Sequence, residues 1–137
     1  MAGGRPHALG GWFYEPTVIA DAAPGMRVYD EENFAPISAV CAFDTLDEVI
    51  AKANDTEYGL AAYVCATNVN TIFQLVRRLD FAMVSVNGVK FTGAPIPFGG
   101  MKASGLGREG GVEGFEPFVE TKYFCLGNLG LPLAAMA

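Results

Sequence analysis

Three cysteines and one histidine are the residues of this 137-residue chain that most readily support nucleophilic or metal chemistry. Cys41, Cys65 and Cys125 lie far apart, and none shows the C-x-x-C or Cys/His spacing of a metal site. Each falls within an apolar segment expected to form a strand, where a buried structural cysteine is the usual outcome. His7 lies in a glycine-rich N-terminal loop. The residue types therefore predict no catalytic centre and no metal site in this chain.

Two other patterns could carry chemistry. Residues 105–110 read G-L-G-R-E-G and match the G-x-G-x-x-G fingerprint, which cradles phosphates between a strand and a helix. Here the motif follows a loop, and the segment after it is too short for a helix, a strand and a ribose-binding acid, so a tightly folded glycine loop is the favoured interpretation. Glu31 and Glu32 could act as paired carboxylates, but adjacent acids are usually just solvated.

Composition narrows the class of protein. Nine Lys and Arg against fifteen Asp and Glu give a net charge of −6, so the chain carries no basic surface for nucleic acid. A hydrophobic content of 51% excludes a disordered chain. An odd number of unpaired cysteines argues against a disulfide scaffold and favours a reducing compartment, from which we expect a cytoplasmic location.

The chain is more apolar than its size requires. Its mean hydropathy is +0.27, yet no apolar run approaches the roughly 18 residues of a membrane helix. The longest runs, 60–66 and 129–137, are short, and the N-terminus has no apolar core like that of a signal peptide. We therefore expect no membrane association. The surplus apolar surface indicates packing against other subunits or membership of something larger.

The hydrophobic pattern predicts an α/β fold with parallel strands, because short apolar strands alternate with helices of about ten residues. Thr45 and Glu48 have the spacing of a capping box that opens one helix, and Asn68 can cap a second. Residues 87–114 form a long glycine-rich region, followed by helix-like residues over 112–118. The expected strands cover 17–20, 37–43, 60–66, 83–86 and 121–126.

The order of several short motifs resembles the aldehyde dehydrogenase superfamily. The resemblance covers about residues 3–127, and the ending E-T-K-Y-F-C-L-G at 120–127 looks most like the succinate-semialdehyde dehydrogenase branch, whose enzymes use NAD or NADP. The motifs that carry it are F-Y-E-P-T-V at 13–18, E-E-N-F-A-P at 31–36, A-N-D-T-E-Y-G-L-A-A-Y at 53–63, V-N at 86–87 and P-F-G-G-M-K-A-S-G-L-G-R-E-G at 97–110.

The resemblance implies that this chain is the C-terminal portion of such an enzyme. Residues 1–119 would form part of the catalytic domain, and 120–137 an oligomerisation strand and tail. The family's dinucleotide-binding fold, nucleophilic cysteine and general-base glutamate all lie upstream of this region. In the implied reaction, a thiolate attacks the aldehyde, hydride passes to the nicotinamide, and water hydrolyses the resulting thioester. This chain alone is expected to be inactive.

The resemblance also assigns four binding residues. In the family's E-x-F-G-P motif, the glutamate accepts hydrogen bonds from the nicotinamide ribose hydroxyls and the aromatic ring packs against the nicotinamide; these positions are Glu32 and Phe34. Thr92 and Phe98 match positions that line the aldehyde pocket. The first is typically a serine that helps to bind the substrate carboxylate in succinate-semialdehyde enzymes, and threonine keeps that hydroxyl donor.

Other motif residues are expected to support structure. Asn87 and Lys102 would hold the loop rather than touch a ligand, and Arg108 with Glu109 would form a structural ion pair. Ala35 and Ala82 stand where the family usually has glycine, which would matter if either backbone position needed a positive φ. The sequence over 93–96 also departs from the commonest succinate-semialdehyde enzymes.

Two functions from different classes follow. The first is the C-terminal part of an NAD(P)-dependent enzyme that oxidises a short aldehyde, with succinate semialdehyde favoured, and whose partner is the missing N-terminal part. The second is a non-catalytic remnant of that family that survives by self-association through exposed strand edges. A third interpretation, a small nucleotide-binding module built on 105–110, would require NAD binding that a Gly107→Val change abolishes, and no such effect is expected.

Overall fold

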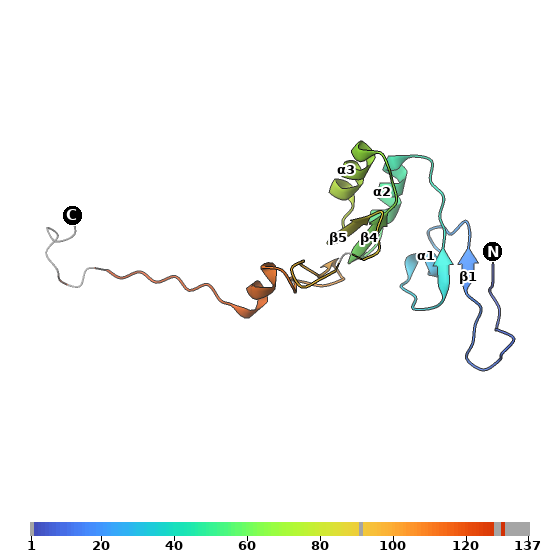
Figure 1. Cartoon of the computed structure of the whole chain (residues 1–137), viewed down its shortest axis with the longest axis horizontal. Coiled ribbons are helices and arrows are strands. Elements are labelled where there is room, and N and C mark those ends of the chain that lie inside the picture. Colours follow the sequence, from blue (N-terminus) through green and yellow to red (C-terminus); the bar gives the residue numbers. More distant parts are fainter. Residues whose placement is uncertain (1, 91, 128–129, 131–137) are drawn as a thin grey trace.

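The chain folds into small parallel sheets flanked by helices (Figure 1). The computed structural model describes residues 2–90, 92–127 and 130. The elements along the chain are β1 (Thr17–Ile19), α1 (Arg27–Asp30), β2 (Ile37–Ala39), α2 (Leu46–Asn54), β3 (Tyr58–Gly59), β4 (Ala61–Val64), α3 (Val69–Arg78), β5 (Met83–Val86), β6 (Met101–Lys102) and the 3₁₀ helix η1 (Glu113–Phe118). The predicted α/β class is confirmed, whereas α1, a single turn, was not predicted.

Both predicted helices begin at their predicted caps. The Thr45 hydroxyl accepts from the Glu48 amide at 3.2 Å and starts α2, and the Asn68 side chain accepts from the Thr71 amide at 3.0 Å and starts α3. The Glu48 carboxylate accepts from the Asp44 amide at 2.8 Å. A capping box would use the amide of the next residue, Thr45. The bond from the Asp44 amide, with the Lys52 ammonium second, lowers the pKa of Glu48. Local capping is sufficient to define these helices.

Parallel pairing connects β1 to β2 and β4 to β5, as the alternation predicted. In the second pair Ala61 lies opposite Met83 and Val64 opposite Val86. The short strands β3 and β6 pair antiparallel. Several strands are shorter than predicted. For example, β2 ends at Ala39 rather than at residue 43. Beyond these pairs, β1 has one further partner on its other edge, an antiparallel bridge between Val18 and Ala2.

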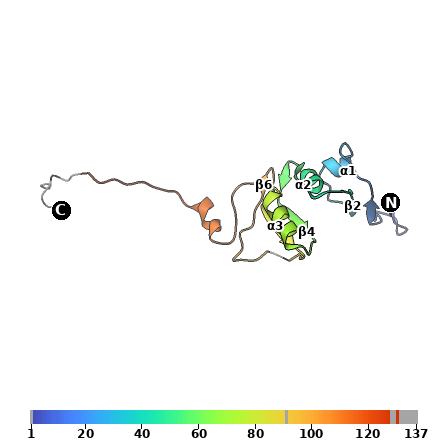
Figure 2. The same ribbon diagram turned by 90° about the horizontal axis from the view of Figure 1, so that it is seen from above.

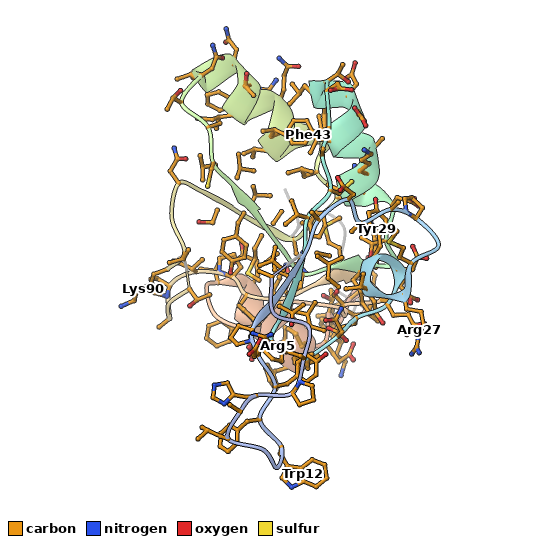
Figure 3. All side chains as sticks on the ribbon, turned by 90° about the vertical axis from the view of Figure 1, so that its right-hand side faces the viewer. Arg5, Trp12, Arg27, Tyr29, Phe43 and Lys90 are labelled. Carbon is orange, nitrogen blue, oxygen red and sulfur yellow. The ribbon has the colours of Figure 1, made fainter. Side chains whose placement is uncertain are left out.

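The core is small. Among the described residues the buried apolar side chains are Ala22, Ile50, Val64 and Met83. The accessible surface of the chain is 10917 Å², against roughly 6,900 Å² for a compact protein of this mass. Large apolar side chains are exposed throughout the described residues, including Trp12 at the tip of the N-terminal hairpin (Figure 3). The surplus apolar surface read from the sequence is therefore present in the fold.

The strand predicted over 121–126 does not form within this chain, and its pairing with a neighbouring subunit stays a prediction. Residues 119–127 form no helix or strand and run as an extended segment away from the sheets in both views (Figures 1 and 2). The cause is that a strand needs a neighbouring edge, and this segment pairs with none in the described part of the chain. Its side chains at Tyr123 and Phe124 are exposed. Residues 128–137 of the predicted tail, Gly130 apart, lie outside the described residues.

No helix in the described part of the chain has both the length and the apolar content that crossing a membrane requires.

Candidate functional site

In the loop after α1, the two adjacent acids Glu31 and Glu32 differ in their hydrogen-bond partners. The Arg27 guanidinium donates to both oxygens of the Glu31 carboxylate, from Nε to Oε1 at 3.0 Å and from Nη2 to Oε2 at 3.0 Å. These hydrogen bonds lower the pKa of Glu31 and raise that of Arg27. Glu32 engages no hydrogen bond or ion pair within the described residues. Its carboxylate oxygens are therefore available to accept from a ligand.

Glu32 lines a cavity of about 310 Å³ between this loop and the β3–β4 region. The other walls include Tyr29, Leu60, Phe81 and Ser104. Burial raises the pKa of Tyr29 further above neutral pH, where a tyrosine hydroxyl is protonated and able to donate in any case. The cavity thus combines a free carboxylate, hydroxyl groups and apolar walls.

Phe34 lies two residues beyond Glu32 and does not line the same cavity. Its side chain is 96% exposed, so the sequence-predicted pair shares one loop without sharing one pocket. Ala35 follows it with a negative φ, and so does Ala82 elsewhere in the chain. The alanines at these positions therefore impose no backbone strain.

Thr92 and Phe98 come together in one cavity of about 350 Å³. Ile96 and Glu109 line the same cavity. The loop that holds Phe98 is closed by a two-way backbone pairing, since the Phe98 amide donates to the Glu109 carbonyl at 2.7 Å and the Phe98 carbonyl accepts from the Glu109 amide at 2.8 Å. Thr92 and Phe98, the two residues predicted to bind substrate, thus lie on one short loop.

A third cavity, of about 250 Å³, lies between these two. It shares Leu60 and Ser104 with the Glu32 cavity, and Phe98 and Glu109 with the Thr92 cavity. Each neighbouring pair of these three cavities therefore has lining residues in common. Sequence reasoning missed Leu60, Phe81 and Ser104 as wall residues, although Leu60 and Ser104 lie inside the quoted motifs, because motif position alone does not tell which side chains face a cavity.

The glycine-rich segment 105–110 is a folded loop rather than a phosphate cradle that opens a helix. The Arg108 guanidinium donates to the carbonyls of Gly100 at 2.8 Å and Gly107 at 2.7 Å. The predicted ion pair between Arg108 and Glu109 is wrong, since Arg108 Nη1 donates to these backbone carbonyls and the side chain forms no ion pair with Glu109. Gly107 and Gly110 have φ values of +68°, which only glycine adopts without strain.

Gly100 is buried within this loop, and an added Cβ would lie 2.5 Å from the Ser104 Cβ. We expect Gly100→Ala to lower the free energy of unfolding by about 1–3 kcal/mol, because Ser104 belongs to a closed turn that cannot move away. Urea denaturation of the chain measures the change. Gly127→Ala is the control, since nothing lies within 4 Å of its added Cβ. Equal midpoints for the two variants would contradict this close packing.

The prediction that all three cysteines are buried is wrong. Cys41 is half-buried, and Cys65 and Cys125 are exposed. Cys65 follows β4, which has a neighbour on one side only, and Cys125 lies on the unpaired C-terminal segment, so no second layer covers either thiol. Within the described residues no group of three or more His, Cys, Asp and Glu side chains could hold a metal ion.

Comparison with known proteins gives consistent results. The aldehyde dehydrogenase family model matches residues 1–124. An aspartate-semialdehyde dehydrogenase (non-phosphorylating) of Halomonas elongata is 54% identical over 95% of this chain and 26% of its own length. The NADP⁺-dependent succinate-semialdehyde dehydrogenase GabD of Escherichia coli K12 is 42% identical over 93% of this chain and 26% of its own. This chain spans about a quarter of the length of these relatives.

A crystal structure gives the same result for the fold. Succinate-semialdehyde dehydrogenase from Burkholderia pseudomallei superposes with a TM-score of 0.84 at 41% identity, over 92% of this chain and 26% of that one. The motif order, the α/β fold and the family match over residues 1–124 agree. The chain belongs to the aldehyde dehydrogenase family.

Proposed function

We propose that this chain forms the C-terminal part of an NAD(P)-dependent aldehyde dehydrogenase that oxidises a short aldehyde bearing a carboxylate, with succinate semialdehyde as the favoured substrate. The observation that carries the proposal is the series of cavities from Glu32 to Thr92, with a free carboxylate at one end and a hydroxyl donor at the other. The chain would supply cofactor and substrate contacts, while the nucleophile, the general base and the dinucleotide fold come from sequence upstream.

The residues at the Glu32 end suit a nicotinamide dinucleotide. A carboxylate can accept from both hydroxyls of a ribose at once, and Glu32 has both oxygens free. The exposed Phe34 ring offers an apolar face against which a nicotinamide could pack. When bound, such a cofactor would accept the hydride that leaves the substrate. Glu32 and Phe34 contribute by fixing its position, since hydride transfer needs closely aligned atoms.

The substrate assignment rests on the Thr92 cavity and on the relatives. The Thr92 hydroxyl can donate to a substrate carboxylate, and Phe98 and Ile96 supply apolar walls for a short carbon chain. Relatives are named for the semialdehydes of aspartate, glutarate and succinate, each of which carries an aldehyde and a carboxylate. The exposed segment 119–127 would serve subunit contact, because extended apolar segments are stabilised by pairing with a neighbouring sheet edge.

A substrate panel tests the proposal in the complete enzyme. We expect kcat/KM with NAD(P)⁺ to be at least about tenfold higher for succinate semialdehyde than for butanal, which has the same chain length without the carboxylate. Glutarate and aspartate semialdehydes measure how far the preference extends to other acidic aldehydes. Equal values for succinate semialdehyde and butanal would contradict the acidic substrate, and no oxidation of any aldehyde would contradict the proposed activity.

A further inference from the structure

The Glu32 cavity and the third cavity share a wall, and one lysine lies next to that wall in the sequence. Leu60 and Ser104 line both the Glu32 cavity and the adjoining cavity that contains Phe98. They lie on either side of the β3–β6 pairing, in which Tyr58 is opposite Lys102. We propose that Lys102 is a positioning residue that holds this shared wall, and through it sets the geometry of the Glu32 cavity and of the third cavity, which shares Phe98 and Glu109 with the Thr92 cavity. The inference rests on the proposed function.

The Lys102 ammonium is bound at the C-terminal end of α2. Nζ donates to the Asn54 carbonyl at 3.1 Å and to the Thr56 carbonyl at 3.2 Å. It also lies 5.8 Å from the centroid of the Phe81 ring, within the range of a cation–π interaction. Phe81 is itself a wall residue of the Glu32 cavity. One side chain thus connects the glycine-rich loop to a helix end and to a cavity wall.

The contacts of Asn54 extend this connection to α3. Its side-chain Nδ2 donates to the Arg78 carbonyl at 2.7 Å, and its Oδ1 accepts from the Asp80 amide at 2.9 Å. The segment that leads from α3 to Phe81 is therefore held by the same residue whose carbonyl receives the Lys102 ammonium. Movement of Lys102 would be transmitted to both sides of the Glu32 cavity.

The backbone at Lys102 needs such support. Its φ is +55°, a left-handed conformation that a side chain with a Cβ adopts only at a cost. The next residues are held as well, since the Ala103 amide donates to the Glu57 carbonyl at 2.9 Å and the Gly59 amide donates to the Ser104 hydroxyl at 2.9 Å. The ammonium contacts and these bonds together fix where Ser104 lies between the cavities.

The test is steady-state kinetics of the complete enzyme. We expect Lys102→Met to raise the KM for the aldehyde and the KM for NAD(P)⁺ each by about tenfold, because it removes two charge-assisted hydrogen bonds that hold the shared wall. The kcat should change by less than about threefold, because no reacting group is lost. Lys102→Arg should restore both KM values to within about threefold, since a guanidinium can also donate to two carbonyls and lie over an aromatic ring.

Lys90→Met is the matched control, because Lys90 is an exposed lysine that points away from the sheets (Figure 3). Unchanged KM values in an active Lys102→Met enzyme, or a loss of thermal stability without a change in KM, would overturn the inference and leave the proposed function standing. No oxidation by the unmodified enzyme would overturn both. If Lys102→Met does not fold, Lys102→Gln replaces it: one amide donor predicts an intermediate rise in both KM values, and unchanged values overturn the inference.

Discussion

Glu32→Gln is expected to weaken the binding of NAD(P)⁺ to the complete enzyme by about 10- to 100-fold. A charge-assisted hydrogen bond contributes about 1.5–3 kcal/mol, and tenfold in affinity corresponds to about 1.4 kcal/mol. Glutamine keeps the size of the side chain but removes the charge and one of the two acceptor oxygens that a ribose diol would use. Calorimetric titration of the cofactor measures the dissociation constant directly.

The neighbouring acid provides the control. Glu31 lines the same cavity as Glu32, but its carboxylate already accepts three hydrogen bonds from Arg27, at 3.0, 3.2 and 3.0 Å. Glu31→Gln should therefore change cofactor affinity by less than about twofold, because exposed ion pairs contribute little. The two variants differ by one position along the chain and carry the same chemical change. An effect of Glu31→Gln equal to that of Glu32→Gln would contradict the assignment of Glu32 as the ribose acceptor.

The sequence predicted the helices best because their signals are local. Thr45 and Asn68 each cap a helix within three or four residues of chain, and the apolar spacing that follows needs no distant partner. The parallel pairing of β4 with β5 was predicted for the same reason, since a helix of about ten residues between two apolar segments leaves few other connections. Local rules were sufficient wherever the partner lies close in sequence.

Two of the departures from expectation share one physical cause. The expected strand over 121–126 and the expected burial of Cys65 and Cys125 both assumed a neighbouring layer. A strand forms only beside the edge of a neighbouring strand, and a thiol is buried only where another layer covers it. Neither the neighbouring edge nor the covering layer is a property of the local sequence. The apolar residues of 119–127 do show strand-like composition, but the described part of the chain offers them no edge to join.

The candidate site was predicted in part. The family motifs gave Thr92 and Phe98, and the structure brings these two into one cavity. The motifs also gave Glu32 and Phe34, which share a loop but not a cavity. The role of the Arg108 side chain was mistaken, because a guanidinium beside a glutamate in sequence can find backbone carbonyls when the loop folds back on itself. Contacts that form when a loop folds back on itself are seen only in the three-dimensional structure.

We also expect no turnover in the isolated chain, an effect on the rate larger than that of Glu32→Gln. Aldehyde oxidation in this family needs a thiolate nucleophile, which the motif resemblance assigns to sequence upstream of this chain. None of Cys41, Cys65 and Cys125 lies in such a motif. Removal of an activated nucleophile costs several orders of magnitude in rate, since binding contacts alone leave only a small residual acceleration.

The measurement that tests the central claim is the aldehyde-dependent formation of NAD(P)H at equal molar concentrations of the purified chain and of the complete enzyme. We expect succinate semialdehyde to give turnover with the complete enzyme and none above background with the chain alone. Glu32→Gln in the complete enzyme should slow turnover at low cofactor concentration. Turnover by the isolated chain would contradict the claim that these residues supply binding surfaces without the catalytic nucleophile.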